Sequence, residues 1–569
     1  MVQKKTDKTL ITESSQIIYD GFIQYNNIFY KITKRAQSRF EKRDWAGHQK
    51  DIAERIDIYE KSVRRIALKL RSHLDHRIND HKLWQITRFY FGKRLEKVPD
   101  AGFIKTFFNS VTRRIFGTVG VDPQIEFVAE NNNADRDVIK RLNLKRYPFW
   151  GSTEKVFSGI LNDFSFKVPY ADSINDDIRR LVESKFARDR EYLRFEFIDS
   201  FFYQAARAYL VGRIIMQNDM SPIVIAFKNT DKGVIIDTVL TSEESISIVF
   251  SYTRSYYFAT PNSVIGSVYF IHSILPKKPI DEIYTVLGRL RQGKTERHRI
   301  FTEHLLTAPD KFTHSEGAEG LVMIVFHLPS YNLVFKIIRD KFGHPKTISR
   351  NHVIDKYKIV SKHDHAGRLI DTQEFLNLKF PINRFSNTLL QDLLDNAKNT
   401  IQIIGDNLLI KHVYIERRVR PLNLYINEVS HDKAEQAILD YGRTIKDLSQ
   451  TNIFPGDLLL KNFGVTQHNR VVFYDYDEVS LVTECNFRDI PKARDDTDEL
   501  RSEPWYYIDK NDIFPEEFIK FLSMKQELRQ VFIRAHGDLL SATYWHGIKT
   551  LLKSGNAPLV TSYYSQYHS

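Results

Sequence analysis

Cysteine is almost absent from this sequence of 569 residues, and long apolar runs are lacking. The one cysteine, Cys485, excludes an intramolecular disulfide and is typical of a reducing compartment. Apolar runs such as Leu321–Phe326 are far shorter than the roughly 20 residues that a membrane-spanning helix needs. No apolar segment follows the lysine-rich residues 1–10, so we expect no signal peptide. These absences predict a cytoplasmic protein without a membrane partner.

Internal repeats and low-complexity linkers are also lacking. Hydrophobic residues make up 42% of the chain and aromatic residues 13%, as in a well-packed globular protein rather than a disordered one. A chain of 569 residues exceeds the size of one ordinary hydrophobic core. We therefore expect two or more globular domains.

Positive charge is in excess and is unevenly distributed. The formal net charge is +12, and residues 1–70 hold 15 Lys/Arg against 9 Asp/Glu, a surplus of 6. One interpretation is an anionic partner such as nucleic acid. We favour solvated faces of amphipathic helices, because no recognised nucleic-acid motif accompanies the charge, and we expect no nucleic-acid partner.

The first half of the chain has mostly helical periodicity. Over residues 10–120, apolar residues recur at three- and four-residue spacing with charged residues between them. Apolar spacing predicts further helices over 180–215, and residues 279–305 again show a helical pattern. Between them, Pro222–Phe227 and Gly233–Asp237 predict two short strands separated by a turn.

The second half begins near residue 311 with strands and continues with helices. Apolar runs predict strands at Leu321–Phe326 and Leu333–Ile338 and two short ones at 408–410 and 413–415. Helical patterns follow at 351–362, 386–400, 431–449 and 515–534.

The most informative motif is Asp457-Leu-Leu-Leu-Lys461-Asn462, followed by Asp475 at a separation of 18 positions (475 − 457). This is the spacing of the catalytic loop and the metal-binding strand of protein kinases. The apolar run Val471–Tyr474 predicts a strand that leads into Asp475, so we expect this carboxylate at a strand end. In that arrangement Asp457 orients or accepts the proton of a substrate hydroxyl. Asn462 and Asp475 bind the metal ions that bridge the ATP phosphates. A turn is the alternative for the Pro-Gly-Asp sequence that ends at Asp457.

Upstream residues predict the rest of a nucleotide site. Lys336 lies inside the apolar run Leu333–Ile338, and together with the downstream motif it is the candidate nucleotide-binding lysine. Taken alone, an exposed strand lysine is the more usual interpretation. In Ser315–Leu321, Gly317 and Gly320 allow a backbone to approach phosphates closely, although an ordinary glycine-containing loop is equally compatible.

Two further carboxylates suggest chemistry beyond that of a kinase. Asp475 and Asp477 are two positions apart, so on an extended segment they point to the same side. Asp477 is therefore a candidate for a second metal site or for activating a water, and a surface acidic turn is the alternative. Asp371 is a candidate acid or base. An equally good interpretation makes Asp371 the N-cap of a helix, with Glu374 completing a capping box.

Strands followed mostly by helices, together with the kinase motif, predict the fold class. We expect an α+β protein. Residues 1–310 would form a mostly helical domain with a small β part, and residues 311–569 a bilobal protein-kinase-like domain.

The motifs around Lys336, Asp371 and Asp457–Asp477 together resemble those of the bacterial isocitrate dehydrogenase kinase/phosphatase family. The similar segments extend over nearly the whole chain: Phe107–Ser110, Ser247–Phe250, Arg254–Tyr256, Gly293–Glu296, Val334–Lys336, Asp371–Phe375, Tyr414–Arg418, Asn452–Asp457, Lys461–Gly464, Phe473–Glu478, Asn486–Pro491 and Ser502–Trp505.

The resemblance implies one active site that phosphorylates a serine of isocitrate dehydrogenase with ATP and also removes that phosphate. Such an enzyme controls flux between the tricarboxylic acid cycle and the glyoxylate bypass. The implied cofactors are ATP, ADP and Mg²⁺ (or Mn²⁺). AMP is implied as an allosteric effector bound between a regulatory N-terminal half and the catalytic half. A homodimer is compatible with the resemblance.

The resemblance also assigns roles to residues. It implies metal ligands at Asn462 and Asp475, and catalytic roles for Asp457 in phosphorylation, Asp371 in dephosphorylation, and Asp477. It implies ATP contacts at Ser315, Glu316, Gly317, Ala318, Glu319, Gly320, Leu321 and Lys336. The two glutamates depart from the familiar loop, so we expect the backbone to make its phosphate contacts.

A second hypothesis is a pseudokinase-like module that senses AMP and ATP by binding alone. The intact residues Lys336, Asp457, Asn462 and Asp475 argue against it.

Overall fold

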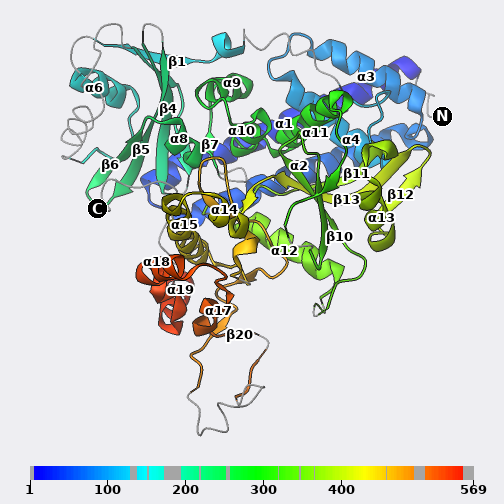
Figure 1. The fold of residues 1–569 in the computed structure, drawn as a ribbon. Coiled ribbons are helices and arrows are strands. Elements are labelled where there is room, and N and C mark those ends of the chain that lie inside the picture. Colours follow the sequence, from blue (N-terminus) through cyan, green and yellow to red (C-terminus); the bar gives the residue numbers. More distant parts are fainter. Residues whose placement is uncertain are drawn as a thin grey trace. The chain divides into compact units, whose positions relative to one another are not determined.

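The computed structural model (Figure 1) describes residues 6–128, 138–149, 153–171, 194–204, 206–216, 219–251, 257–317, 320–344, 346, 348–363, 366–456, 458–491, 506–509 and 511–554. The chain divides into two compact units, one made mainly of residues 1–308 and the other mainly of residues 309–562.

The first unit begins with four helices, as predicted for residues 10–120. They are α1 (Asp7–Glu41), α2 (Trp45–Leu74), α3 (His81–Leu95) and α4 (Ala101–Phe116). The side chain of Asp44 caps α2 by accepting the Gly47 N–H, which satisfies a donor that the helix itself leaves unpaired.

Aromatic side chains fill the core between these helices. Phe22 and Tyr25 of α1 pack against Phe103 and Phe107 of α4, and the ring of Tyr59 of α2 meets that of Tyr25 edge-on at 5.2 Å. Edge-on and offset ring pairs are favourable beyond the area that they bury.

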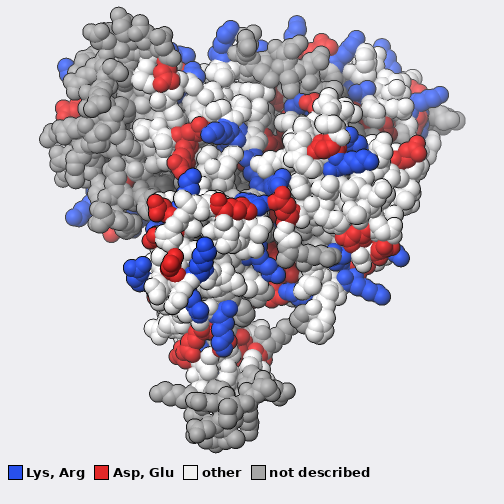
Figure 2. All heavy atoms as spheres, in the orientation of Figure 1, with Lys and Arg blue, Asp and Glu red and all other residues white. Residues whose placement is uncertain are grey.

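The basic surplus of residues 1–70 is partly paired between α1 and α2. The buried carboxylate of Asp51 lies 2.9 Å from both Arg35 and Arg39. On the face drawn in Figure 2, positive and negative side chains are interspersed in small groups.

A seven-stranded sheet follows in the first unit, with the path β1-β2-β4-β3-β7, and with β5 paired to β4 and β6 paired to β5. Its strands are β1 (Leu144–Pro148), β2 (Arg194–Ile198), β3 (Phe202–Gln204), β4 (Arg207–Ile215), β5 (Met220–Thr230), β6 (Gly233–Leu240) and β7 (Phe258–Ala259).

The strands β5 and β6 confirm the two strands predicted at Pro222–Phe227 and Gly233–Asp237. The helices predicted over 180–215 are wrong for the described residues 194–204 and 206–215, which contain β2, β3 and β4. The apolar residues that suggested a helix, Leu193, Phe197 and Phe201, are four positions apart. That spacing fits one face of a strand as well as one face of a helix, because four is a multiple of the strand period of two.

Helices complete the first unit. They are α6 (Thr153–Asp163), α8 (Glu243–Val249), α9 (Val264–Ile274), α10 (Ile280–Val286) and α11 (Leu290–Thr307), and the last two confirm the helical pattern at 279–305.

The second unit begins with a six-stranded sheet in the order β11-β13-β10-β9-β8, with β12 paired to β13. Its strands are β8 (Thr313–His314), β9 (Met323–His327), β10 (Leu333–Ile338), β11 (Gln373–Pro381), β12 (Ile401–Ile404) and β13 (Asn407–Arg417). The predicted strands at 408–410 and 413–415 are one continuous strand, β13. It runs antiparallel to β10, with Val334 opposite Glu416 and Lys336 opposite Tyr414.

Helices dominate the rest of this unit. They are α12 (Arg350–His363), α13 (Asn387–Asn396), α14 (Leu422–Glu428), α15 (His431–Gln450), α17 (Phe518–Phe521), α18 (Gln526–His536) and α19 (Ala542–Lys553). Figure 1 shows α15, α18 and α19 in a group apart from the strands β10 to β13, as in a two-lobed kinase domain. The predicted α+β class is confirmed. Among the described helices, none has the length and apolar character needed to cross a membrane.

Candidate active site

A cavity of about 580 Å³ lies within the second unit. Pockets for small molecules and cofactors typically measure about 300–1,000 Å³, so this one is large enough for a nucleotide. The lining includes Lys336, Asn462, Asp475 and Asp477, four of the residues predicted from the sequence. The fold therefore brings together side chains that are up to 141 positions apart (477 − 336).

The glycine loop forms one wall of this cavity. Ser315, Glu316, Gly317, Gly320 and Leu321 line it, whereas Ala318 and Glu319 lie outside the described residues. Gly317 has a φ of 116°, which L-amino acids with side chains rarely adopt. At Gly320 an added Cβ would lie 2.7 Å from the carbonyl oxygen of Met323. Both glycines are thus required by the backbone path of the loop.

Glu316 is paired with arginines. Its carboxylate contacts Arg420 and lies 3.7 Å from Arg418. The hydrogen bond from Arg420 lowers the pKa of Glu316 below its ordinary value. Because this negative charge is compensated, a glutamate in the loop does not prevent the binding of an anionic phosphate beside it.

Lys336 is buried in β10 and lines the cavity. Its Nζ lies 2.5 Å from Oε1 of Glu416 and donates a hydrogen bond to the carbonyl oxygen of Tyr474 at 2.8 Å. The exposed strand lysine considered from the sequence is therefore wrong. Lys336 has the buried position and the carboxylate partner of a nucleotide-binding lysine.

A hairpin brings the metal-ligand candidates together. The strands β16 (Phe463–Val465) and β17 (Val471–Phe473) are antiparallel, and Phe463 lies opposite Phe473. Asn462 therefore precedes one strand at the point where Asp475 follows the other, and the Tyr474 N–H donates to the carbonyl oxygen of Asn462. The prediction that Asp475 follows a strand end is confirmed.

The electrostatics around Asp475 and Asp477 suit a divalent cation. Burial and the neighbouring carboxylate of Asp477 raise the pKa of Asp475 to about 8, although Lys336 and Lys346 act in the opposite direction. A bound cation would relieve this penalty, since Mg²⁺ prefers carboxylate oxygens and the oxygens of phosphates. Within the described part of the chain, no cluster of three or more His, Cys, Asp or Glu side chains suits a metal. Asn462 and Asp475 are the residues that would hold such a cation.

Lys346 is a cavity residue that the sequence patterns did not indicate. Its Nζ lies 3.5 Å from Oδ2 of Asp477 and also contacts Glu478. It comes from the loop between β10 and α12, where no motif marks it. The surface acidic turn considered for Asp477 is wrong, because Asp477 lines the cavity and its side chain is only 12% exposed.

Asp457 lies outside the described residues, whereas Gly456 and Leu458 on either side of it are described. Gly456 has a φ of 82°, and a Cβ added there would lie 2.6 Å from the carbonyl oxygen of Glu478. On the other side, the hydroxyl of Tyr441 donates to the carbonyl oxygen of Leu458 at 2.6 Å. Gly456 therefore lies beside Glu478, and Leu458 is bound to helix α15.

Asp371 does not belong to the lining of this cavity. It directly follows Leu369–Ile370, which pairs in parallel with Phe473 of β17, and Nε2 of Gln373 donates to its Oδ2 at 2.9 Å. The capping-box interpretation is wrong, because Gln373 begins the strand β11 rather than a helix. Backbone pairing instead places the segments that carry Asp371 and Asp475 side by side.

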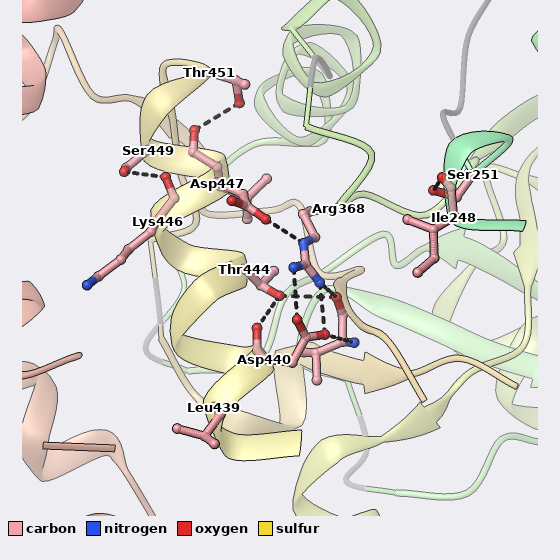
Figure 3. Close-up of polar contacts among 12 residues, drawn as sticks. Ile248, Ser251, Arg368, Leu439, Asp440, Thr444, Lys446, Asp447, Ser449 and Thr451 are labelled. Carbon is pink, nitrogen blue, oxygen red and sulfur yellow. Dashed lines mark hydrogen bonds and ion pairs between the residues drawn. The ribbon is translucent and has the colours of Figure 1, made fainter. Parts of the chain in front are cut away.

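A buried ion-pair network fixes these two segments to helix α15 (Figure 3). Arg368 makes two hydrogen bonds of 2.8 Å to Asp440 and one of 2.7 Å to Asp447. Its guanidinium also donates to the carbonyl oxygen of Val471, whose N–H donates to Asp440. Sequence reasoning missed this network. The only signal was two aspartates seven positions apart, on one face of a predicted helix.

Comparisons with known proteins identify the family of this chain. A family model of the isocitrate dehydrogenase kinase/phosphatase (AceK) kinase domain matches residues 310–565, and one of the regulatory domain matches residues 15–309. An isocitrate dehydrogenase kinase/phosphatase of Anaeromyxobacter sp. (strain Fw109-5) is 43% identical over 540 residues, which cover 94% of each chain. One of Xanthomonas euvesicatoria pv. vesicatoria (strain 85-10) is 40% identical over 552 residues, 96% of this chain and 95% of the relative. The chain belongs to the isocitrate dehydrogenase kinase/phosphatase family.

Proposed function

We propose that this protein phosphorylates a serine of isocitrate dehydrogenase with ATP and removes the same phosphate, both at the cavity of the second unit. Its activity would control flux between the tricarboxylic acid cycle and the glyoxylate bypass. The observation that carries the proposal is the meeting of Lys336, Asn462, Asp475 and Asp477 in one cavity. A buried nucleotide-binding lysine together with an asparagine and an aspartate that bind the metal is the arrangement of a protein-kinase site.

In the forward reaction the substrate serine oxygen attacks the γ-phosphorus of ATP, the bond to the β-phosphate oxygen breaks, and ADP leaves. Asp457 accepts the hydroxyl proton, and Lys336 binds phosphate oxygens. The backbone of the glycine loop, residues 315–321, covers the phosphates. Mg²⁺ (or Mn²⁺), held by Asn462 and Asp475, would neutralise the charge that develops on the phosphate oxygens.

In the reverse direction a water attacks the phosphoserine phosphorus, and the bond to the serine oxygen breaks. Asp371, whose segment pairs with β17, takes the proton from the water and passes it to the serine oxygen as inorganic phosphate leaves. Asp477 orients the water or the cation, because it stands beside Asp475 where an ordinary kinase has glycine. ATP or ADP in the same cavity would keep Lys336 and the cation in place.

Residues 1–310 would form the regulatory domain and 311–569 the catalytic domain, with AMP acting as an allosteric effector. The protein would act in the cytoplasm, and a homodimer is compatible with this function. The regulatory role is supported by the family model that matches residues 15–309.

Incubation with isocitrate dehydrogenase and Mg-ATP, with and without AMP, tests the proposal when phosphate gain and phosphate loss are both followed. We expect phosphorylation without AMP and faster dephosphorylation with it. Nucleotide binding without transfer of labelled phosphate would instead support the second candidate, a pseudokinase-like sensor of AMP and ATP.

A further inference from the structure

The buried lysine of this site has an unusual partner. In protein kinases the nucleotide-binding lysine pairs with a glutamate of the helix that follows its strand, and movement of that helix switches the pair on and off. Here the helix after β10 is α12, and its sequence contains no glutamate. Its one carboxylate, Asp355, has a side chain that is 67% exposed and pairs with Lys358. The helix therefore does not provide the usual partner.

The strand β13 provides the partner instead. Glu416 is 3% exposed and lies opposite Val334, so it is diagonal to Lys336 on the neighbouring strand. Diagonal pairs of this kind are within reach of long side chains. Because β10 and β13 are hydrogen-bonded neighbours in one sheet, the ion pair of 2.5 Å does not depend on the position of a helix.

The second carboxylate oxygen of Glu416 binds Thr372. Its Oε2 accepts a hydrogen bond of 2.8 Å from the hydroxyl of Thr372, whose side chain is buried. Thr372 follows Asp371 directly and precedes β11. One buried carboxylate thus contacts the nucleotide lysine through one oxygen and the segment of Asp371 through the other.

Lys336 retains capacity for a ligand in this arrangement. Its ammonium group has three donors. Among the described residues, two of these donors are used by Glu416 and by the carbonyl oxygen of Tyr474. The third is available to a phosphate oxygen in the cavity that Lys336 lines. A phosphate can therefore bind without breaking the contact to Glu416.

We propose that Glu416 is a positioning residue that couples the nucleotide-binding lysine to the segment carrying Asp371, so that the two activities share one fixed element. This inference rests on the proposed function. Through Oε1 the carboxylate holds Lys336 for both reactions. Through Oε2 it holds Thr372, and with it Asp371, for dephosphorylation alone.

The test separates the contact of Glu416 with Lys336 from its contact with Thr372. The full-length protein and its variants Glu416→Gln, Thr372→Val and Thr372→Ser are assayed for phosphorylation and dephosphorylation of isocitrate dehydrogenase at several ATP concentrations. Thr400→Val is the matched control, because Thr400 is a buried threonine of the same unit that does not line the cavity. Thermal unfolding of each variant is recorded alongside.

We expect Glu416→Gln to raise the KM for ATP and to slow dephosphorylation, each about tenfold, the effect of losing one hydrogen bond to a charged group. Thr372→Val should slow dephosphorylation about tenfold while the KM and kcat of phosphorylation change less than about twofold. Thr372→Ser, which keeps the hydroxyl, and Thr400→Val should match the unaltered protein.

The coupling is overturned if Thr372→Val lowers both activities equally or neither, or if Thr372→Ser fails to restore dephosphorylation. It is also overturned if Glu416→Gln alters only one activity. If Thr372→Val does not fold, Thr372→Ala takes its place with the same expectations. Failure of the unaltered protein to show one of the two activities would refute the proposed function rather than the coupling.

Discussion

Replacement of Arg368 by methionine should destabilise the second unit strongly. The side chain of Arg368 is 4% exposed, and those of Asp440 and Asp447 are 20% and 14% exposed. Methionine fills much of the space but removes the cation that hydrogen-bonds to both carboxylates. Removing one partner of a buried ion pair costs about 3–5 kcal/mol, whereas an exposed pair contributes about 0–1 kcal/mol.

This loss of unfolding free energy can be converted to a change in melting temperature. For a domain of 150–250 residues each kcal/mol corresponds to about 2–4 °C, so Arg368→Met should lower the Tm of the second unit by about 6–20 °C. Calorimetry of the full-length chain measures this change. As a control, Arg368→Met combined with Asp440→Asn and Asp447→Asn should recover part of the loss, because no unpaired carboxylate remains.

If Arg368→Met lowered the Tm by less than about 3 °C, this reasoning would be refuted, since the network would then behave like a surface ion pair. The same result would also remove the argument that Arg368 fixes the segments of Asp371 and Asp475. If the triple variant were as unstable as Arg368→Met, buried charge would not be the cause of the loss.

Four further predictions concern the site itself. Lys336→Met should lower phosphorylation and dephosphorylation at subsaturating ATP by about 10–100-fold, because a charged hydrogen bond to phosphate is lost; an unchanged KM for ATP would contradict this. Asp371→Ala should slow dephosphorylation about 10²–10⁴-fold and phosphorylation much less, and intact dephosphorylation would exclude its acid–base role. Gly456→Ala should impair both activities and lower the Tm, since its Cβ would lie 2.6 Å from the carbonyl oxygen of Glu478, and wild-type values would refute that contact. Chelation of divalent cations by EDTA should abolish phosphorylation, and added Mg²⁺ should restore it; activity retained in EDTA would contradict the metal assignment.

The sequence was sufficient to predict strands and helices that follow from the local spacing of apolar residues. The strand that carries Lys336 and the strand end before Asp475 are as predicted, because apolar runs mark both. The helices of residues 10–120 are likewise correct, since long amphipathic patterns leave little ambiguity.

The features that could not be predicted from the sequence depend on contacts between distant segments. The partner of Lys336 was not predictable, because Glu416 is 80 positions away (416 − 336) and becomes its neighbour only through strand pairing. The segment after Asp371 allowed two interpretations, since a polar stretch can begin a helix or a strand. Only its pairing within the sheet decides between them. Arg368 was missed for the same reason, because its two carboxylates come from a helix more than 70 positions later (440 − 368).

The central claim is that one cavity serves both phosphate addition and phosphate removal. Asp475→Asn tests it most directly, because this change removes one carboxylate from the proposed metal site while retaining the shape of the side chain. When phosphate gain and loss by isocitrate dehydrogenase are followed with the same preparation, both should fall at least about a hundredfold. Normal dephosphorylation by a variant that has lost phosphorylation would contradict the shared site.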